Sequence, residues 1–356
     1  MKSADNKTEL IVREQEPLNL EMPFSSLASF ITPNDLFYVR CHFPVPAIAV
    51  ADWRLSVEGE IESPLALSYD DLLEMEPRTI TATLECAGNN RIFLEPKVKG
   101  VQWGLGAVGN ATWTGVPLAA VLERAKINPA TVEVILDGAD EGEVDKTPQP
   151  EGEISYCRSV PLAKAMSDVL LAYEMNGEKL SVTHGFPLRA IVPGWYAMAS
   201  VKWLQRIIVT DRPFNGFYQS LDYTYWDRSG PLPTLAPLTE QAVKAEIARP
   251  ENGEVIAART SYRIHGAAWS GEAEISRVEI SFDNGAAWQD ATLLGEPVKN
   301  AWRLWEFEWS TPASSGHHSI VARATDSLGR TQSPERSGDR GTYMINHLLP
   351  VQVEVR

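Results

Sequence analysis

The segment TLECAGNNR, residues 83–91, is the most informative stretch of this sequence. It extends the short apolar run TITATLEC, which predicts a β-strand, and it ends in small and polar residues, which predict a loop. Cys86 therefore lies where a strand ends, and the small Ala87 and Gly88 would let a bulky group approach the backbone. A thiolate in this position suits a metal ligand. The structural alternative is a buried cysteine that packs as a small hydrophobic residue.

Strand and helix patterns alternate on both sides of Cys86. The runs TITATLEC and VEVILDGAD predict strands, and PLAAVLERAKI and PLAKAMSDVLLAYEMNG predict helices. This mixture indicates an α+β domain. We place the domain at residues 1–240, because the texture changes near residues 230–250, where the proline-rich stretch GPLPTLAPLTE predicts a linker.

Alternating apolar and polar segments dominate after the linker. Turn sequences such as Asp283-Asn284-Gly285 and 326–329 separate them. Their number and spacing predict an immunoglobulin-like antiparallel β-sandwich at residues 241–356. The strands carry no catalytic cluster, so we expect this domain to pack against the first or to pair two subunits. The predicted strands are SYRIHGAAW, SRVEISFDNG, WRLWEFEW, HHSIVARATDS and PVQVEVR.

Length and charge exclude several classes of protein. The 356 residues, 44% of them hydrophobic, suffice for a large core and two domains. The net charge of -15 opposes attraction to phosphate backbones, so we expect no nucleic-acid partner. We also expect no membrane partner, because no apolar segment is long enough to cross a bilayer. The start, MKSADNKTELIVREQEP, has no signal core, which predicts a cytoplasmic location as written, or a periplasmic one if an export signal was removed.

The cysteines and histidines do not form a familiar metal motif. Cys41, Cys86 and Cys157 are too few for a disulfide framework, and their odd number leaves at least one free thiol. Without a CxxC pair, an HExxH motif or a histidine cluster, zinc, iron–sulfur and c-type haem sites have no ligand set. A soft metal at Cys86 would need sulfurs from elsewhere. An organic dithiolate such as molybdopterin would supply them.

Four separated motifs resemble the molybdenum-binding core of the sulfite oxidase family, which includes sulfite dehydrogenases, plant-type nitrate reductases and sulfane dehydrogenases. The region after the linker resembles the family's dimerisation domain, so the resemblance covers most of the chain. It implies the sulfite oxidase fold, a molybdopterin cofactor and a homodimer. The motifs are TLECAGNNR with VKGVQWGLGAVGNATWTGVPL, YVRCHFPVP at 38–46, HGFPLR at 184–189 with Pro193-Gly194, and VKWL at 201–204.

The resemblance implies roles for matching residues around the metal. Cys86 matches the thiolate that ligates molybdenum, and Arg40 and Arg91 match two arginines of the anion pocket. Trp103 matches the aromatic wall of that pocket. Tyr223, in the pair Asp222-Tyr223, matches the hydroxyl beside the reacting oxygen, with Tyr218 and Tyr225 as alternatives close in sequence. Contacts to the cofactor are implied for Tyr38, Arg40, His42, Cys86, His184, Arg189 and Lys202.

Three positions depart from the family pattern. Arg340, before Gly341, is the nearest match to a further arginine that the family takes from its second domain, but its surroundings differ from those of the family. Asn90 stands where many relatives have a second basic residue. Cys41 replaces an asparagine common in the family.

The resemblance implies a molybdenum-dependent oxidoreductase that oxidises sulfite to sulfate by oxygen-atom transfer, chemistry that no side chain provides. Guanidinium groups such as those of Arg40 and Arg91 suit a small oxyanion. We expect no haem in this chain and an external electron acceptor, of which a basic cytochrome c would suit the acidic surface. Two alternatives remain. The same cofactor could act on nitrate or a sulfane sulfur, or the chain could be a non-catalytic binding protein with a buried Cys86.

Overall fold

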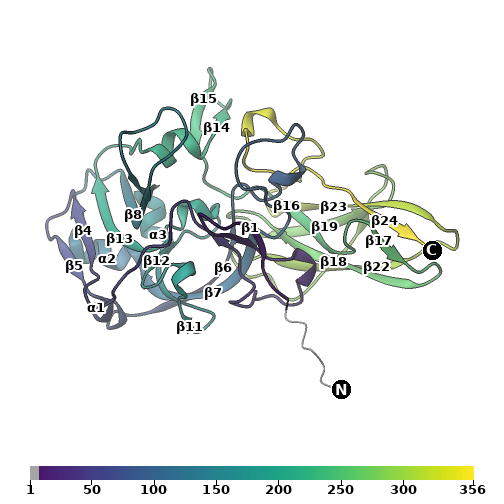
Figure 1. Cartoon of the computed structure of the whole chain (residues 1–356), viewed down its shortest axis with the longest axis horizontal. Helices are drawn as coiled ribbons and strands as arrows, with labels where there is room; N and C mark the ends of the chain where they lie inside the picture. The colour runs from purple at the N-terminus through teal and green to yellow at the C-terminus, as the bar shows by residue number, and fades with distance from the viewer. Residues whose placement is uncertain (1–7) are drawn as a thin grey trace.

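The computed structural model describes residues 8–356 and shows two parts side by side (Figure 1). The amino-terminal part, on the left, contains the three α-helices of the described residues, and the carboxy-terminal part, on the right, consists of strands. The predicted location rests in part on residues 1–7, which lie outside the described part. Within residues 8–356, no helix has both the length and the apolar character needed to cross a membrane.

Two five-stranded sheets form most of the amino-terminal part. The first has the order β11 (Glu178–Lys179), β10 (Leu170–Met175), β7 (Val108–Pro117) and β6 (Arg78–Glu85), with β12 (Arg189–Ile191) also paired to β10. The second has the order β5 (Leu65–Leu67), β4 (Leu55–Gly59), β13 (Leu204–Thr210), β8 (Glu133–Gly142) and β9 (Ile154–Pro161). A smaller sheet joins β1 (Ile11–Glu14), β2 (Asn19–Glu21) and β3 (Val39–Arg40).

The helices of this part are short. The α-helices are α1 (Tyr69–Leu73), α2 (Leu118–Ala125) and α3 (Leu162–Ser167). Each buries apolar residues, such as Leu72 of α1 and Val121 of α2, in a core shared with the second sheet. Single turns connect other elements: η1 (Phe24–Ser26), η2 (Arg91–Phe93), η3 (Val182–His184), η4 (Ala197–Ala199), η5 (Tyr218–Asp222) and, in the second part, η6 (Gly338–Arg340).

The strands and the first helix predicted for this part are confirmed by β6, β8 and α2, but the second predicted helix is only partly correct. Residues 162–167 form α3, whereas Leu170–Met175 form β10. The helix ends at Asp168, whose φ of -147° is not helical. The apolar run that follows pairs with β7 on one side and β12 on the other. These tertiary contacts outweigh a local pattern that fits either structure.

The carboxy-terminal part is a β-sandwich, as predicted. One sheet has the order β16 (Lys244–Arg249), β18 (Ser261–Trp269), β22 (Arg303–Ser310) and β21 (Thr292–Leu293). The other has β17 (Glu254–Ile256), β24 (Val351–Val355), β23 (Gly316–Asp326), β19 (Ile275–Ser281) and β20 (Gln289–Asp290). Asn284 and Gly285 have φ values of 57° and 90° in the predicted turn after β19. Together with the first part, the sandwich confirms the predicted fold class.

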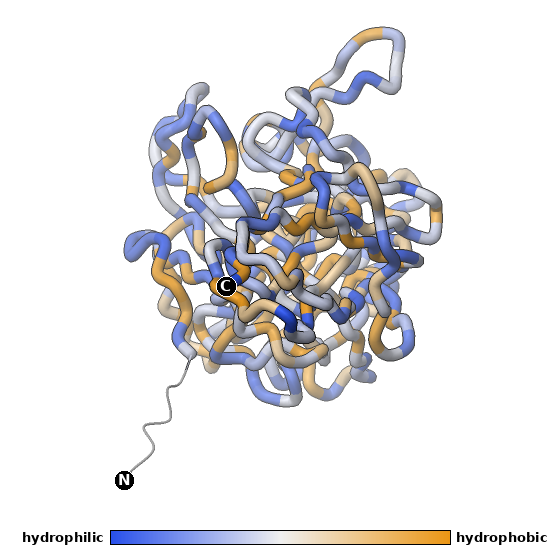
Figure 2. The backbone as a smooth tube through the Cα atoms, turned by 90° about the vertical axis from the view of Figure 1, so that its right-hand side faces the viewer, coloured by the Kyte–Doolittle hydropathy of each residue, from blue (hydrophilic) through white to orange (hydrophobic). Residues whose placement is uncertain are grey.

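The predicted linker is more ordered than we expected. Residues Thr234–Pro237 form β15, which pairs with β14 (Thr224–Asp227) in a hairpin that projects from the molecule (Figure 1). Pro231 and Pro233 precede β15, so their missing N–H groups do not interrupt its ladder. The boundary between residues 240 and 241 stays a prediction. Figure 2, viewed from the end that carries the carboxyl terminus, shows many hydrophilic residues on the projecting loops.

Candidate active site

One cavity in the amino-terminal part gathers most of the residues implied by the sequence motifs. Its walls come from strand ends and from the turns that follow them, which is where a sheet exposes functional side chains. The predicted residues that line the cavity are Tyr38, Arg40, His42, Cys86, His184, Arg189, Lys202 and Tyr223. Segments that are far apart in the sequence therefore meet here, as expected for a binding site.

Cys86 enters this cavity from the end of β6. Its backbone N–H donates to the Ala107 carbonyl at 2.9 Å, which continues the pairing with β7 for one residue. Side chains alternate along a strand, so Leu84 and Cys86 share a face, and both line the cavity. The thiol is unpaired and only 6% of the residue is exposed.

The protein alone offers few further metal ligands. Within residues 8–356, no group of three or more histidine, cysteine, aspartate or glutamate side chains could hold an ion. A metal at Cys86 would therefore take most of its ligands from a bound organic group.

Cationic side chains also line the cavity. Arg189 donates to the His184 carbonyl at 3.0 Å and lies 4.9 Å from the ring centroid of Trp113. Lys202 Nζ donates to the Thr183 carbonyl at 2.8 Å and to Cys41 Sγ at 3.3 Å. Burial lowers the pKa of Arg189 to about 10, so it stays charged at neutral pH. Burial, reinforced by both cations, lowers the pKa of His184 to about 3, so its imidazole is neutral.

Two buried polar atoms in the cavity wall make no hydrogen bond within the described residues. They are Oδ1 of Asp140 and Nε of Arg189. A buried polar group without a partner costs free energy, so an acceptor and a donor left open here fit a polar ligand. Burial raises the pKa of Asp140 to about 7. Molybdopterin, which presents the N–H groups of its pterin ring and a terminal phosphate, matches this combination of an acidic acceptor with cationic donors.

Tyr223 and His42 form a hydrogen-bonded pair in the same cavity. The distance from the Tyr223 hydroxyl to His42 Nε2 is 2.6 Å, and His42 stacks on Tyr156 at 4.1 Å between centroids. Burial raises the pKa of Tyr223, and burial together with Arg40 lowers the pKa of His42, so both groups are neutral at pH 7. Of the alternatives near Tyr223, Tyr218 contacts His42 edge-on without lining the cavity, and Tyr225 lines a different one.

Three predicted residues do not line this cavity. Arg91 is buried beside it and donates to the Val101 and Thr342 carbonyls at 2.7 and 3.3 Å. Trp103 is fully buried and packs edge-to-face against Tyr38. Arg340 binds Asn346 Oδ1 and lines another cavity with Arg330. The structure thus brings Arg91 and Trp103 near the site and leaves Arg340 apart from it. Their roles stay predictions.

Sequence reasoning missed several residues at the site. Asp140 and Tyr156 line the cavity from β8 and β9, within strands that look like ordinary core segments. Arg158 is fully buried, donates to the Leu238 carbonyl at 2.9 Å and lies 6.0 Å from the Tyr223 ring centroid. Tyr343 reaches from the second part, with ring centroids 4.8 Å apart from Tyr223. The sequence did offer one indication of Arg158 and Asp140, because each is a charged residue inside an otherwise apolar run.

Comparisons with known proteins agree with this geometry. A family model described as an oxidoreductase molybdopterin binding domain matches residues 42–218, and one described as a Mo-co oxidoreductase dimerisation domain matches residues 236–348. The sulfite oxidase of Arabidopsis thaliana is 36% identical over 351 residues, which cover 91% of this chain and 88% of that protein. This chain belongs to the sulfite oxidase family.

Other relatives in the family differ in length and name. The mitochondrial sulfite oxidase of Rattus norvegicus is 37% identical over 89% of this chain, but this chain spans only 60% of that protein. A crystal structure of the sulfane dehydrogenase SoxCD from Paracoccus pantotrophus has a TM-score of 0.83 and 26% identity, covering 99% of this chain and 92% of that one. These matches confirm the sulfite oxidase fold and the molybdopterin-binding domain.

Proposed function

We propose that this protein is a molybdenum-dependent oxidoreductase that oxidises sulfite to sulfate and passes the electrons to an external acceptor. The observation that carries the proposal is the shared cavity, in which the Cys86 thiol lies with Arg40, Lys202 and Arg189. A soft ligand and several cations in one buried place suit a metal cofactor with an anionic tail. The named sulfite oxidases among the relatives support sulfite as the substrate.

Different residues of the cavity would bind different parts of the cofactor. When bound, the molybdenum cofactor supplies the oxygen-atom transfer and the two-electron chemistry that side chains lack. Cys86 would hold the metal, and Arg189 and Lys202 would bind the phosphate through charge-assisted hydrogen bonds. Asp140, with its open Oδ1, would accept from a pterin N–H group, and His184 would contact the pterin as a neutral imidazole.

Arg40 would attract and orient the anion, and Arg91, which lies outside the cavity lining, would add to the positive field. The net charge of -15 repels anions at long range, so binding requires a local positive field. Arg40 lines the cavity, and its Nη1 also donates to Asn19 Oδ1 at 3.3 Å, which fixes one side of the guanidinium. The overall reaction converts sulfite and water into sulfate, two protons and two electrons. The Tyr223 hydroxyl and His42 Nε2 share a hydrogen bond of 2.6 Å, through which the pair would relay a proton at the reacting centre.

The partners follow from the same reasoning. The sandwich would pair two chains in a homodimer, and the acidic surface would favour a basic one-electron carrier such as a cytochrome c. We propose that the protein acts in the cytoplasm or, if it is exported, in the periplasm.

A second substrate class has a specific observation in its favour. The similarity to a sulfane dehydrogenase extends over 99% of this chain, so the same cofactor could act on a sulfane sulfur. Nitrate is the third substrate to test, because it is also a small oxyanion.

The test compares three substrates on one preparation made in a host that produces molybdopterin. Sulfite and thiosulfate are assayed by dye reduction, and nitrate by oxidation of reduced dye. We expect bound molybdenum and the highest kcat/KM with sulfite. A preparation that carries molybdenum but prefers thiosulfate or nitrate would reassign the substrate. Protein without molybdenum would favour a non-catalytic binding function.

A further inference from the structure

The strand that ends at Cys86 also contacts the second part of the molecule. On β6, Leu84 and Cys86 face the cavity, whereas Thr83 and Glu85 face the sandwich. Thr83 Oγ1 accepts from the Trp302 N–H at 2.8 Å, and the Thr83 N–H donates to the Asn300 carbonyl at 2.9 Å. The strand that leads to the thiol is therefore attached to the second part of the molecule.

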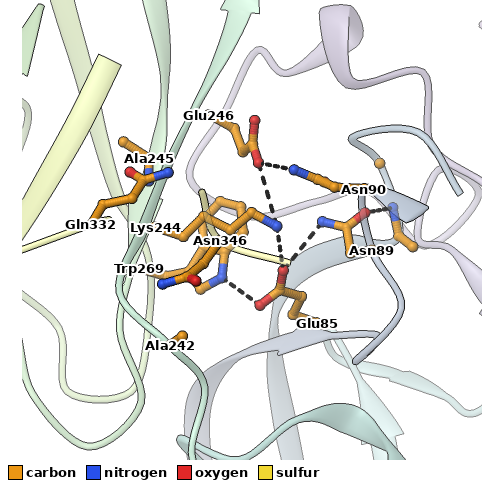
Figure 3. Close-up of polar contacts among 12 residues, drawn as sticks. Glu85, Asn89, Asn90, Ala242, Lys244, Ala245, Glu246, Trp269, Gln332 and Asn346 are labelled. Carbon is orange, nitrogen blue, oxygen red and sulfur yellow. Dashed lines mark hydrogen bonds and ion pairs between the residues drawn. The ribbon is translucent and has the colours of Figure 1, made fainter. Parts of the chain in front are cut away.

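Glu85, the residue before Cys86, carries the strongest of these contacts (Figure 3). Its two carboxylate oxygens accept separately, one from Lys244 Nζ at 2.9 Å and one from Trp269 Nε1 at 2.9 Å. Lys244 lies on β16 and Trp269 on β18, so neighbouring strands of one sheet hold the same carboxylate.

The network continues to the loop after Cys86. Lys244 Nζ also lies 3.4 Å from Glu246 Oε1, and Glu246 accepts a hydrogen bond from Asn90 Nδ2. Asn89 Nδ2 donates back to Glu85 at 3.3 Å. Figure 3 shows these side chains pointing toward one another between the two domains. Cys86 thus lies between two residues, Glu85 and Asn90, that Lys244 and Glu246 together connect.

The network is almost fully buried, which decides what it can do. The exposed fraction is 2% for Glu85, 1% for Lys244 and 4% for Glu246. A buried ion pair adds little net stability compared with apolar residues of the same volume, but removing one member leaves its partners uncompensated. Such a network is therefore suited to holding the residues around it in fixed positions. Catalytic and metal sites need this kind of support around the residues that bind.

We propose that the sandwich domain positions the Cys86 thiol through this network, with Lys244 and Glu246 as positioning residues that never touch the cofactor. The proposal rests on the proposed function of Cys86 as the metal ligand. It gives the second domain a role in the site beyond pairing subunits. Lys244 transmits the position of β16 to Glu85, and Glu246 transmits it to Asn90.

The first test uses full-length protein made without molybdopterin. Alkylation of Cys86, Cys41 and Cys157 is followed separately by peptide mass spectrometry in the wild type, Lys244→Met and Glu246→Gln. We expect Cys86 to react about tenfold faster in Lys244→Met and less so in Glu246→Gln, because local opening becomes easier when a buried charge loses its partner. Cys41 and Cys157 should react at their wild-type rates.

The matched control is Asp326→Asn, which removes another buried charge in the sandwich. Asp326 accepts from Ser270 Oγ and Arg330 Nε at 2.9 and 2.7 Å, and among the described residues it forms no hydrogen bond or ion pair with residues 83–91. Its melting temperature should fall while Cys86 keeps its wild-type rate. An unchanged Cys86 rate in Lys244→Met and Glu246→Gln, or equal acceleration of all three thiols, would overturn the proposal. If Lys244→Met does not accumulate, Glu246→Gln decides by the same criteria.

The second test uses protein loaded with the cofactor. Molybdenum per chain and kcat per bound molybdenum should both fall in Lys244→Met, with KM for sulfite within about twofold of wild type, because Lys244 does not contact the anion. Wild-type values for the variant, with an active wild type, would refute the positioning role. A wild type that neither binds molybdenum nor oxidises sulfite would instead refute the proposed function on which this role rests.

Discussion

At the scale of single residues, the site combines neutral proton carriers with permanent cations. Tyr223 and His42 are neutral at pH 7 because burial disfavours their charged forms, while Arg40 and Arg189 remain protonated beside them. Such a pair can relay a proton without leaving a buried charge only when one group takes up a proton as the other gives one up. The cations remain available for anionic groups.

Removing the Tyr223 hydroxyl tests this division of roles. In Tyr223→Phe, His42 Nε2 loses its partner at 2.6 Å. We expect kcat for sulfite to fall by about 100-fold, the usual contribution of a positioned proton carrier, with KM nearly unchanged. Stability should fall by only about 1 kcal/mol. Steady-state kinetics and urea unfolding measure both; a wild-type kcat would remove Tyr223 from the chemistry.

The lowered pKa of His184 predicts how stability depends on pH. The folded protein holds this imidazole neutral down to about pH 3, whereas the unfolded chain binds its proton below about pH 6.5. Stability therefore falls as pH decreases through this window, because the unfolded state binds more protons.

This group alone should cost about 1.5 kcal/mol between pH 6.5 and pH 5. Urea unfolding of the cofactor-free protein measures the change, with His184→Gln as the comparison. We expect the variant to lose less stability over the same interval. Equal losses in the two proteins would show that His184 does not titrate as described.

Some residues of the site could be identified from the sequence, and others could not. The motifs placed Cys86, Arg40 and Lys202 in one site because each motif carries a recognisable chemical pattern. Asp140 has no such motif, and only the fold shows that its carboxylate points into the cavity. Arg340 shows the converse, because a sequence match alone could not show that its guanidinium binds Asn346 elsewhere.

At the scale of elements, β6 connects the two domains. Side chains on one face of β6 line the cavity, and side chains on its other face bind the sandwich. The short apolar run TITATLEC predicted the strand, but not what each face contacts, because the partners lie far away in the sequence. The same limitation explains β10, where pairing with β7 and β12 outweighs a pattern that also fits a helix.

Thr83→Val tests the interdomain face of β6. The hydroxyl donates to Asn110 Oδ1 at 3.0 Å and accepts from the Trp302 N–H, and all three residues are buried. We expect a loss of about 2 kcal/mol, because valine keeps the shape and leaves both partners unsatisfied.

Thr79→Val is the matched control on the same strand. Its hydroxyl contacts Thr114 at the exposed end of β6, so the change should be within about 0.5 kcal/mol. Urea unfolding measures both variants. Equal losses would mean that the interdomain bonds of Thr83 contribute nothing special to stability.

At the scale of the whole molecule, charge governs the encounter with an electron acceptor. The net charge of -15 would attract a basic protein and leave a neutral dye unaffected. We expect kcat/KM for a basic cytochrome c to fall at least about tenfold between 10 and 200 mM salt, because salt screens surface charges. The dye assay should change less than about twofold over the same range. Parallel salt titrations compare them, and identical curves would exclude electrostatic attraction.

We expect the Cys86 sulfur to bind molybdenum, and X-ray absorption at the molybdenum edge detects such a bond. The loaded wild type and Cys86→Ser are compared after matching their molybdenum content. The variant should lack one of the sulfur neighbours present in the wild type and should no longer oxidise sulfite. The same number of sulfur neighbours in both proteins would show that Cys86 is not a ligand of molybdenum.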